Sequence, residues 1–228
     1  MVKTTKSNTI LAIFDTFKSK SDLTGEANRQ RSIISILAGS GNPTEKTRTG
    51  ISQQIAAKQG IIWKNIYSGI FRDLDEVLIP AGIVEEKGRL PLKRGPKALQ
   101  EQGIPYYHLT RSGILVALAT NGVEGMEKIA GKFFAESEPE EKKFEKAIAS
   151  MQKLSPDFTY SILQKYVKAF CDGLMEDLLP FDPAKLKHTN DQTINMQKEI
   201  LDVFLTLPKQ DIAQVLGFLD RIAQNAKH

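Results

Sequence analysis

The chain has 228 residues, of which 41% are apolar and 25% are charged. This is the composition of an ordinary globular protein, and it excludes collagen-like, low-complexity and wholly disordered chains. No apolar run approaches the roughly 20 residues that a membrane span requires, and no apolar signal-peptide stretch follows Met1. A single cysteine, Cys171, excludes an internal disulfide. We therefore expect a cytoplasmic protein with no membrane partner.

The basic charge is concentrated in the first half of the chain. Residues 1–122 contain 17 Lys and Arg against 10 Asp and Glu, a net charge of +7, whereas residues 123–228 contain 14 against 17, a net charge of −3. This asymmetry favours a first half that faces a polyanion and a second half that has another role. Ordinary solvated surface charge is the alternative explanation.

The first third of the chain alternates helical patterns with a polar loop. Residues 8–18 carry apolar side chains at helical spacing, so we expect a short helix that packs on a neighbouring element. A further helix is predicted over about 28–38, and the stretch 38–50, rich in Gly, Pro, Ser and Thr, is predicted to be a loop. Two closely joined helices are predicted next, over about 50–58 and 62–79.

The helix predicted over 62–79 is amphipathic and ends at Pro80. Its apolar stripe consists of Ile66, Ile70, Leu74, Val77 and Leu78, and the charged residues expected off the stripe are Arg72, Asp73, Asp75 and Glu76. The next patterns are short β-prone stretches over 83–86 and 104–109, which flank a connection rich in Gly and Pro. Thr110 is then predicted to cap a helix over about 111–120.

The remainder of the chain carries helical periodicity only. Helices are predicted over 123–135, 139–153, 157–179, 191–206 and 209–226, with proline-bearing joints between several of them. The change of charge coincides with the turn sequence Asn121-Gly122. We therefore predict an N-terminal helix or extension over 1–27, a domain over 28–122 and an all-helical domain over 123–228.

The short connection before residue 62 has the spacing of a helix-turn-helix. Two helices joined by a short turn cross steeply only when the inner helix offers a small residue and the turn offers a glycine. Ala56 stands four residues before Gly60, and Ile55, Ile61 and Ile66 are expected to fill the space beneath the turn. The β-hairpin predicted directly after the second helix strengthens this interpretation.

The segment from about residue 28 to residue 120 resembles the winged helix-turn-helix family of DNA-binding domains. The resemblance rests on SQQIAAKQGIIWKNIYSGIFRDLDEVLIPAGIVEEKG and on YYHLTRSGILVALA. The second stretch is similar to the closing strand of the family, which runs into Leu-Thr-x-x-Gly and a helix, supplied here by Leu109, Thr110 and Gly113. The connection between the strands is longer than a minimal wing. The resemblance covers about two-fifths of the chain and implies a mostly α fold with a small β-hairpin wing, an N-terminal winged helix-turn-helix followed by a C-terminal helical bundle.

The resemblance also implies which residues face DNA. The recognition helix would be 62–79, with Trp63, Lys64, Asn65, Tyr67, Ser68 and Arg72 on the turns that face the major groove. Thr49, Ser52 and Gln53 would lie near a backbone phosphate at the start of the preceding helix. Packing against the hairpin is the alternative role of Trp63 and Tyr67. N-capping is the alternative role of Thr49, Ser52 and Gln53.

The connection between the β-prone stretches is basic. From Lys87 to Lys97 it carries Lys87, Arg89, Lys93, Arg94 and Lys97 and no acidic residue. In a hairpin tip such side chains enter a minor groove or clamp phosphates, and a solvated loop is the alternative.

Residues that would support catalysis or cofactor binding do not form a recognisable set. The stretch GSGNPTEKT has Glu45 where a phosphate-binding loop requires glycine, and the three histidines are scattered without metal-ligand spacing. Cys171 is expected to be a buried apolar residue. We therefore predict no enzymatic activity, no cofactor and no metal.

These patterns together predict a sequence-specific DNA-binding transcriptional regulator. Its partner would be double-stranded DNA, and residues 123–228 would form a homodimer or bind a small-molecule or protein effector. The alternative is a winged-helix protein-interaction or RNA-binding module in a larger assembly.

Overall fold

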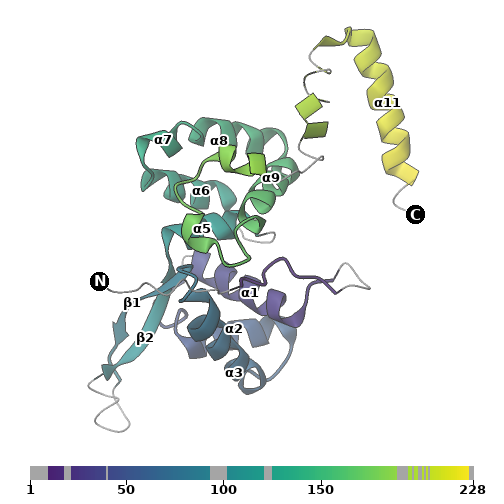
Figure 1. Ribbon diagram of the computed structural model, residues 1–228. Coiled ribbons are helices and arrows are strands. Elements are labelled where there is room, and N and C mark those ends of the chain that lie inside the picture. The colour runs from purple at the N-terminus through teal and green to yellow at the C-terminus, as the bar shows by residue number, and fades with distance from the viewer. Residues whose placement is uncertain are drawn as a thin grey trace. The chain divides into compact units, whose positions relative to one another are not determined.

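The computed structural model describes residues 10–17, 22–39, 41–92, 102–120, 125–188, 195–196, 198–199, 202, 204 and 206–225. Contacts divide the chain into two units, Met1–Leu186 and Lys187–His228. The described residues are mostly helical with one two-stranded antiparallel sheet, which confirms a mostly α fold with a small β-hairpin (Figure 1). Among these residues, no helix is both long and apolar enough to cross a membrane.

The chain enters the first unit as an irregular segment, so the helix predicted over 8–18 is wrong for residues 10–17. The four side chains from Leu11 to Phe14 are all buried. Four consecutive residues of a surface helix would point to different sides, so this burial indicates a segment that is enclosed from several sides. Backbone groups are held by distant partners. The Leu11 N–H donates to the Cys171 carbonyl at 3.0 Å, and the Ala12 N–H donates to the buried Gln30 side chain at 3.0 Å. The expected packing on neighbouring elements is therefore confirmed.

Helices α1 (Gly25–Ala38) and α2 (Arg48–Gln59) begin at threonine caps, Thr24 and Thr47, whose hydroxyls accept backbone N–H groups. α2 ends at Gly60, which has a left-handed conformation (φ 66°, ψ 28°) and donates its N–H to the Ala56 carbonyl. This C-cap is the turn predicted from the spacing of the alanine and the glycine.

The residues around this turn are divided between core and surface. Ile55 and Ala56 are buried and Ile66 packs against the core, as predicted. Ile61 is 43% exposed, so the prediction that it fills the space beneath the turn is wrong. It lies immediately after the left-handed glycine, where the chain has already left the axis of α2.

Helix α3 (Lys64–Arg72) continues directly into a π-helical segment, η1 (Asp73–Leu78). Ile70, Leu74 and Leu78 are fully buried and Ile66 and Val77 pack beside them, which confirms the predicted apolar stripe. Asp73, expected among the charged residues off the stripe, is instead buried.

Strands β1 (Val84–Leu90) and β2 (Ile104–Leu109) form the predicted hairpin, and β1 extends beyond its predicted end. Val84 pairs with Leu109, and the register shifts between Glu86 and Gly88. An isolated antiparallel bridge also joins Thr47, just before α2, to Tyr106 of β2. The hairpin projects from the helices of its unit (Figure 1).

Helix α5 (Arg111–Leu118) is central to the first unit. The Thr110 hydroxyl accepts the Gly113 N–H at 3.1 Å, which confirms the predicted cap, and residues 113–120 are all buried. α5 packs against α1, β2, α6 and α9, and one apolar core runs from Leu11 to Phe181. Residues 121–124, where the sequence predicts a domain boundary, lie outside the described residues.

The helices that follow are shorter than predicted. They are α6 (Met126–Ala135), α7 (Pro139–Lys142), α8 (Glu145–Leu154) and α9 (Pro156–Lys168), followed by the 3₁₀ segments η2 (Met175–Asp177) and η3 (Pro183–His188). The helix predicted over 157–179 ends at Lys168, and the Tyr166 hydroxyl donates to the Leu178 carbonyl at 2.8 Å, which holds the returning chain. In the second unit α11 (Lys209–Asn225) confirms the last predicted helix.

Candidate nucleic-acid interface

The outward face of α3 carries the residues that the sequence assigned to DNA contacts. Lys64, Asn65, Ser68 and Arg72 are exposed, whereas the opposite side of the helix packs on the core. Lys64, Ser68 and Phe71 follow the 4-then-3 spacing of one helical stripe, with Asn65 and Arg72 beside them. The face therefore combines two cations with an amide, a hydroxyl and an aromatic ring.

Two aromatic residues lie at the N-terminal end of α3. Trp63 and Tyr67 are partly buried, and their rings meet edge to face with centroids 5.7 Å apart. This packing restricts both rings, and it accounts for part of their surface before any partner binds.

The start of α2 presents fewer side chains than the sequence suggested. Thr49 and Gln53 are exposed, but Ser52 is 0% exposed and its hydroxyl donates to the Arg48 carbonyl at 2.7 Å. Ser52 therefore does not belong to this surface. N-capping, the alternative role of these residues, falls to Thr47, which was not among the predicted residues.

Arg48 connects α2 to the hairpin and to α3. Its guanidinium carbon lies 4.4 Å from the centroid of the Phe71 ring and 5.3 Å from that of Tyr107, and the guanidinium forms an ion pair with Asp75. Burial raises the pKa of the Tyr107 hydroxyl, so this ring stays neutral. Because this cluster joins three elements, it holds the base of the hairpin in a defined place beside α3.

The described part of the hairpin carries both signs of charge. Lys87 and Arg89 are exposed, but Arg89 forms an ion pair with Glu86 at 2.6 Å and also donates to the Gln102 carbonyl. On the same stem, His108 lies 3.1 Å from Glu85. Lys93, Arg94 and Lys97 lie outside the described residues.

A hollow of about 350 Å³ lies between α1 and α3. It is lined by Arg29, Asn65, Ile66, Ser68, Gly69 and Arg72. The Arg29 guanidinium forms a fork with the Asp73 carboxylate, with Nε–Oδ2 at 2.8 Å and Nη2–Oδ1 at 3.3 Å. A Cβ on Gly69 would lie 2.9 Å from Arg29 Nε, so the absence of a side chain there lets Arg29 cross α3.

Sequence reasoning missed Arg29, although two signals pointed to it. A glycine inside a helix costs stability and needs a reason, and Gly69 is such a residue. An aspartate beside the apolar stripe, here Asp73, requires a partner if it is buried. The sequence contains no indication that this partner comes from α1.

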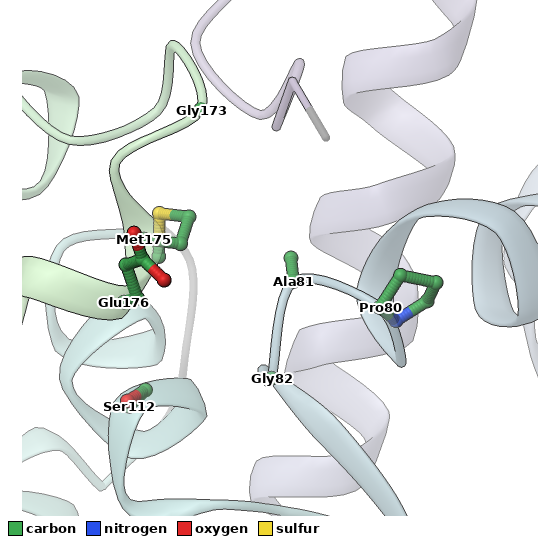
Figure 2. A pocket seen from close by; sticks show the side chains of 7 residues that line it. All are labelled: Pro80, Ala81, Gly82, Ser112, Gly173, Met175 and Glu176. Carbon is green, nitrogen blue, oxygen red and sulfur yellow. The ribbon is translucent and has the colours of Figure 1, made fainter. Parts of the chain in front are cut away.

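A second hollow, of about 220 Å³, lies where the turn after η1 approaches η2. Figure 2 shows Met175 and Glu176 on one side of it and Ala81 and Gly82 on the other, with Ser112 nearby. Its charged lining residue is the Glu176 carboxylate, so it is unsuited to a polyanion. The hollow beside α3, with two guanidinium groups, has the opposite character.

Comparisons with protein families, with curated proteins and with solved structures found no significant match to this chain.

Proposed function

We propose that the protein is a cytoplasmic, sequence-specific DNA-binding transcriptional regulator built on a winged helix-turn-helix. The observation that carries the proposal is the order of elements. A left-handed Gly60 joins α2 to α3, a hairpin follows α3, and β2 pairs back to Thr47 before α2. A winged helix brings its strands together in this order and leaves the second helix of the turn free to enter the major groove.

The outward face of α3 supplies the groups that such a helix uses. Asn65 is suited to a base edge, since an amide can form two hydrogen bonds to one base, and the Arg72 guanidinium can pair in the same way with a base or with a phosphate. Lys64 and Ser68 are suited to phosphates, as are Thr49 and Gln53 at the start of α2. Phe71 adds an apolar group suited to a thymine methyl.

The hairpin is proposed to grip the DNA backbone. Lys87 and Arg89 lie on its stem, and the basic residues 93, 94 and 97 follow in the connection between its strands. Cationic side chains on a projecting hairpin reach phosphates or the minor groove without reading sequence. The Arg48 cluster supports this role because it holds the base of the hairpin beside α3.

We further propose that the protein binds DNA as a homodimer through residues 123–228, and that an effector, if one binds, acts through the same half. α11 exposes Val215, Leu216 and Phe218, so it has apolar surface to bury against a partner. Size-exclusion chromatography with light scattering at tens of micromolar protein tests this, and a strict monomer would remove the dimer from the proposal.

Fluorescence anisotropy with a random-sequence duplex, measured over 50–200 mM salt, tests the DNA-binding function. Each phosphate neutralised contributes about 0.9 to the slope of log affinity against log salt, so a protein with several contacts shows a steep loss of affinity. Selection from a random pool should then yield a consensus sequence, and Asn65→Ala should change it. Lys128→Ala, at an exposed position of α6, is the control for loss of one positive charge.

A protein-interaction or RNA-binding module remains the second candidate, and one observation favours a protein partner. Ile61 and Ile62 are 43% and 64% exposed beside the partly buried Trp63, which is unusual for a surface that faces only DNA. In that case the full chain would show little salt-dependent affinity for DNA and would co-purify with a stoichiometric partner. Tighter binding to RNA than to duplex DNA would favour the RNA alternative.

A further inference from the structure

The hollow between α1 and α3 has the construction of an anion site. Arg29 and Arg72 both line it, and the Asn65 amide and Ser68 hydroxyl line it as uncharged hydrogen-bonding groups. Residues 65, 68, 69 and 72 share one side of α3 because they follow helical spacing, and Arg29 reaches this side from α1.

The ion pair of Arg29 holds its guanidinium in place. Asp73 is 0% exposed, whereas the Arg29 side chain is 23% exposed. An incoming ligand therefore meets the guanidinium and not the carboxylate. Two nitrogens of Arg29 are used by the fork with Asp73, so the side chain is oriented before a ligand binds and loses little rotamer freedom on binding.

Gly69 makes room for this arrangement. A side chain at this position would collide with Arg29 at its Nε, Cδ and Cζ atoms, all within 3.4 Å of the position that a Cβ would take. The Arg29 stem therefore crosses α3 over Gly69 and carries its charge to the hollow. Glycine inside a helix costs stability, and at Gly69 the close approach of Arg29 gives the position a structural reason for glycine.

The location of the hollow relates it to the proposed DNA surface. Asn65, Ser68 and Arg72 belong both to the outward face of α3 and to the lining. Phe71 contacts Arg48 and lies on the side of this face that is opposite the hollow. A helix in the major groove has a phosphate backbone on each side, and the α1 side of α3 carries the hollow.

We propose that this hollow binds a phosphodiester group of duplex DNA beside the major groove, with Arg72 and the Asp73-held Arg29 as its cationic groups. The inference rests on the proposed DNA-binding function and adds a contact from α1. Arg29 thereby becomes a phosphate-binding residue, and Asp73 and Gly69 become residues that position it.

The test measures the affinity of the full chain for a random-sequence duplex at several salt concentrations. Arg72→Ala removes an exposed cation and should lower the slope of log affinity against log salt by about 0.9, so that the affinity lost between 50 and 200 mM salt is about three- to fourfold smaller than in the parent. Gly69→Ala keeps every charge but displaces Arg29 and should also lower the slope. Lys128→Ala, which removes one exposed cation outside the hollow, should keep the slope of the parent.

A second measurement locates the phosphate. On the selected duplex, single phosphates are replaced by uncharged methylphosphonates, and the positions at which the parent loses affinity should include one on the α1 side of α3. Arg72→Ala should lose less affinity than the parent at that position, because one of the two cations of the contact is already gone. Circular dichroism of each variant confirms folding, and Arg72→Ala keeps the test decisive if Gly69→Ala does not fold.

The outcomes separate this inference from the function on which it rests. If the parent binds DNA with a steep salt slope and both Arg72→Ala and Gly69→Ala keep that slope, the hollow is not a phosphate site and the proposed function stands. If the parent shows no salt-dependent affinity for duplex DNA, the proposed function and the phosphate site are both overturned.

Discussion

The ion pair between Arg29 and Asp73 predicts an unequal response to removal of its two partners. Asp73 is fully buried and Arg29 retains 23% exposure of its side chain. In Arg29→Ala the carboxylate stays in the core without its two hydrogen bonds. In Asp73→Ala the guanidinium can turn towards water. The first variant should therefore be the less stable of the two.

The magnitudes follow from the burial of the group left behind. Breaking a buried pair so that one charge stays uncompensated costs about 3–5 kcal/mol, and we expect Arg29→Ala to fall in this range. Loss of hydrogen bonds to a charged group whose partner regains hydration costs about 1.5–3 kcal/mol, which is the range expected for Asp73→Ala. We therefore expect a difference of about 1–2 kcal/mol in the free energy of unfolding.

Urea unfolding at pH 7, followed by circular dichroism and analysed by linear extrapolation, measures both free energies. Lys128→Ala, on the exposed side of α6, should stay within about 0.5 kcal/mol of the parent and serves as the control for loss of a cation. Equal destabilisation by the two variants, or a larger loss in Asp73→Ala, would show that burial of the carboxylate does not decide the energetics of this pair.

Three further predictions concern packing, thiol chemistry and charge. A Cβ on Gly113 would lie 2.1 Å from the Ile83 carbonyl oxygen at the start of the hairpin, so Gly113→Ala should destabilise the protein by at least about 2 kcal/mol and lower its Tm. Gly131 has open space around it, so Gly131→Ala should not lower the Tm. Equal Tm values for the two variants would contradict the close approach. Burial raises the pKa of the Cys171 thiol to about 12, so iodoacetamide at pH 8 should label it slowly in the folded chain and rapidly in urea. Since this folded-state pKa exceeds the ordinary value of 9.0, the thiol favours folding below pH 9 and loses this contribution as the pH rises towards 12. The parent should therefore lose more unfolding free energy between pH 9 and pH 12 than Cys171→Ala, and equal losses would contradict the assignment. Glu86→Gln removes the acidic partner of Arg89 and should strengthen binding to random duplex DNA with a steeper salt dependence, while an unchanged affinity would show that Arg89 does not approach phosphates.

Features that depend on near neighbours could be predicted from the sequence. The turn at Gly60, the cap at Thr110 and the two strands of the hairpin each depend on residues within a few positions of one another. The apolar stripe of α3 and η1 was likewise predicted, because the periodicity of a helix determines which side chains share a face. The exposed candidates on α3, such as Asn65 and Arg72, follow from the same periodicity.

Features that depend on distant partners could not be predicted in this way. The segment 10–17 has helical periodicity, but its Leu11 amide bonds to Cys171, and it is irregular because the core encloses it. Ser52 is polar and close to a helix start, yet packing buries it.

The clearest case is the site beside α3. The sequence by itself determined the helix, its outward polar face and the hairpin that follows, since these arise from local periodicity and turn chemistry. Only the tertiary structure decided that Asp73 is buried, that Arg29 from α1 pairs with it across 44 positions of the chain, and that Gly69 leaves the space for this contact. The physical reason is that burial of a charge depends on which residues the fold brings together, and sequence spacing carries no record of that.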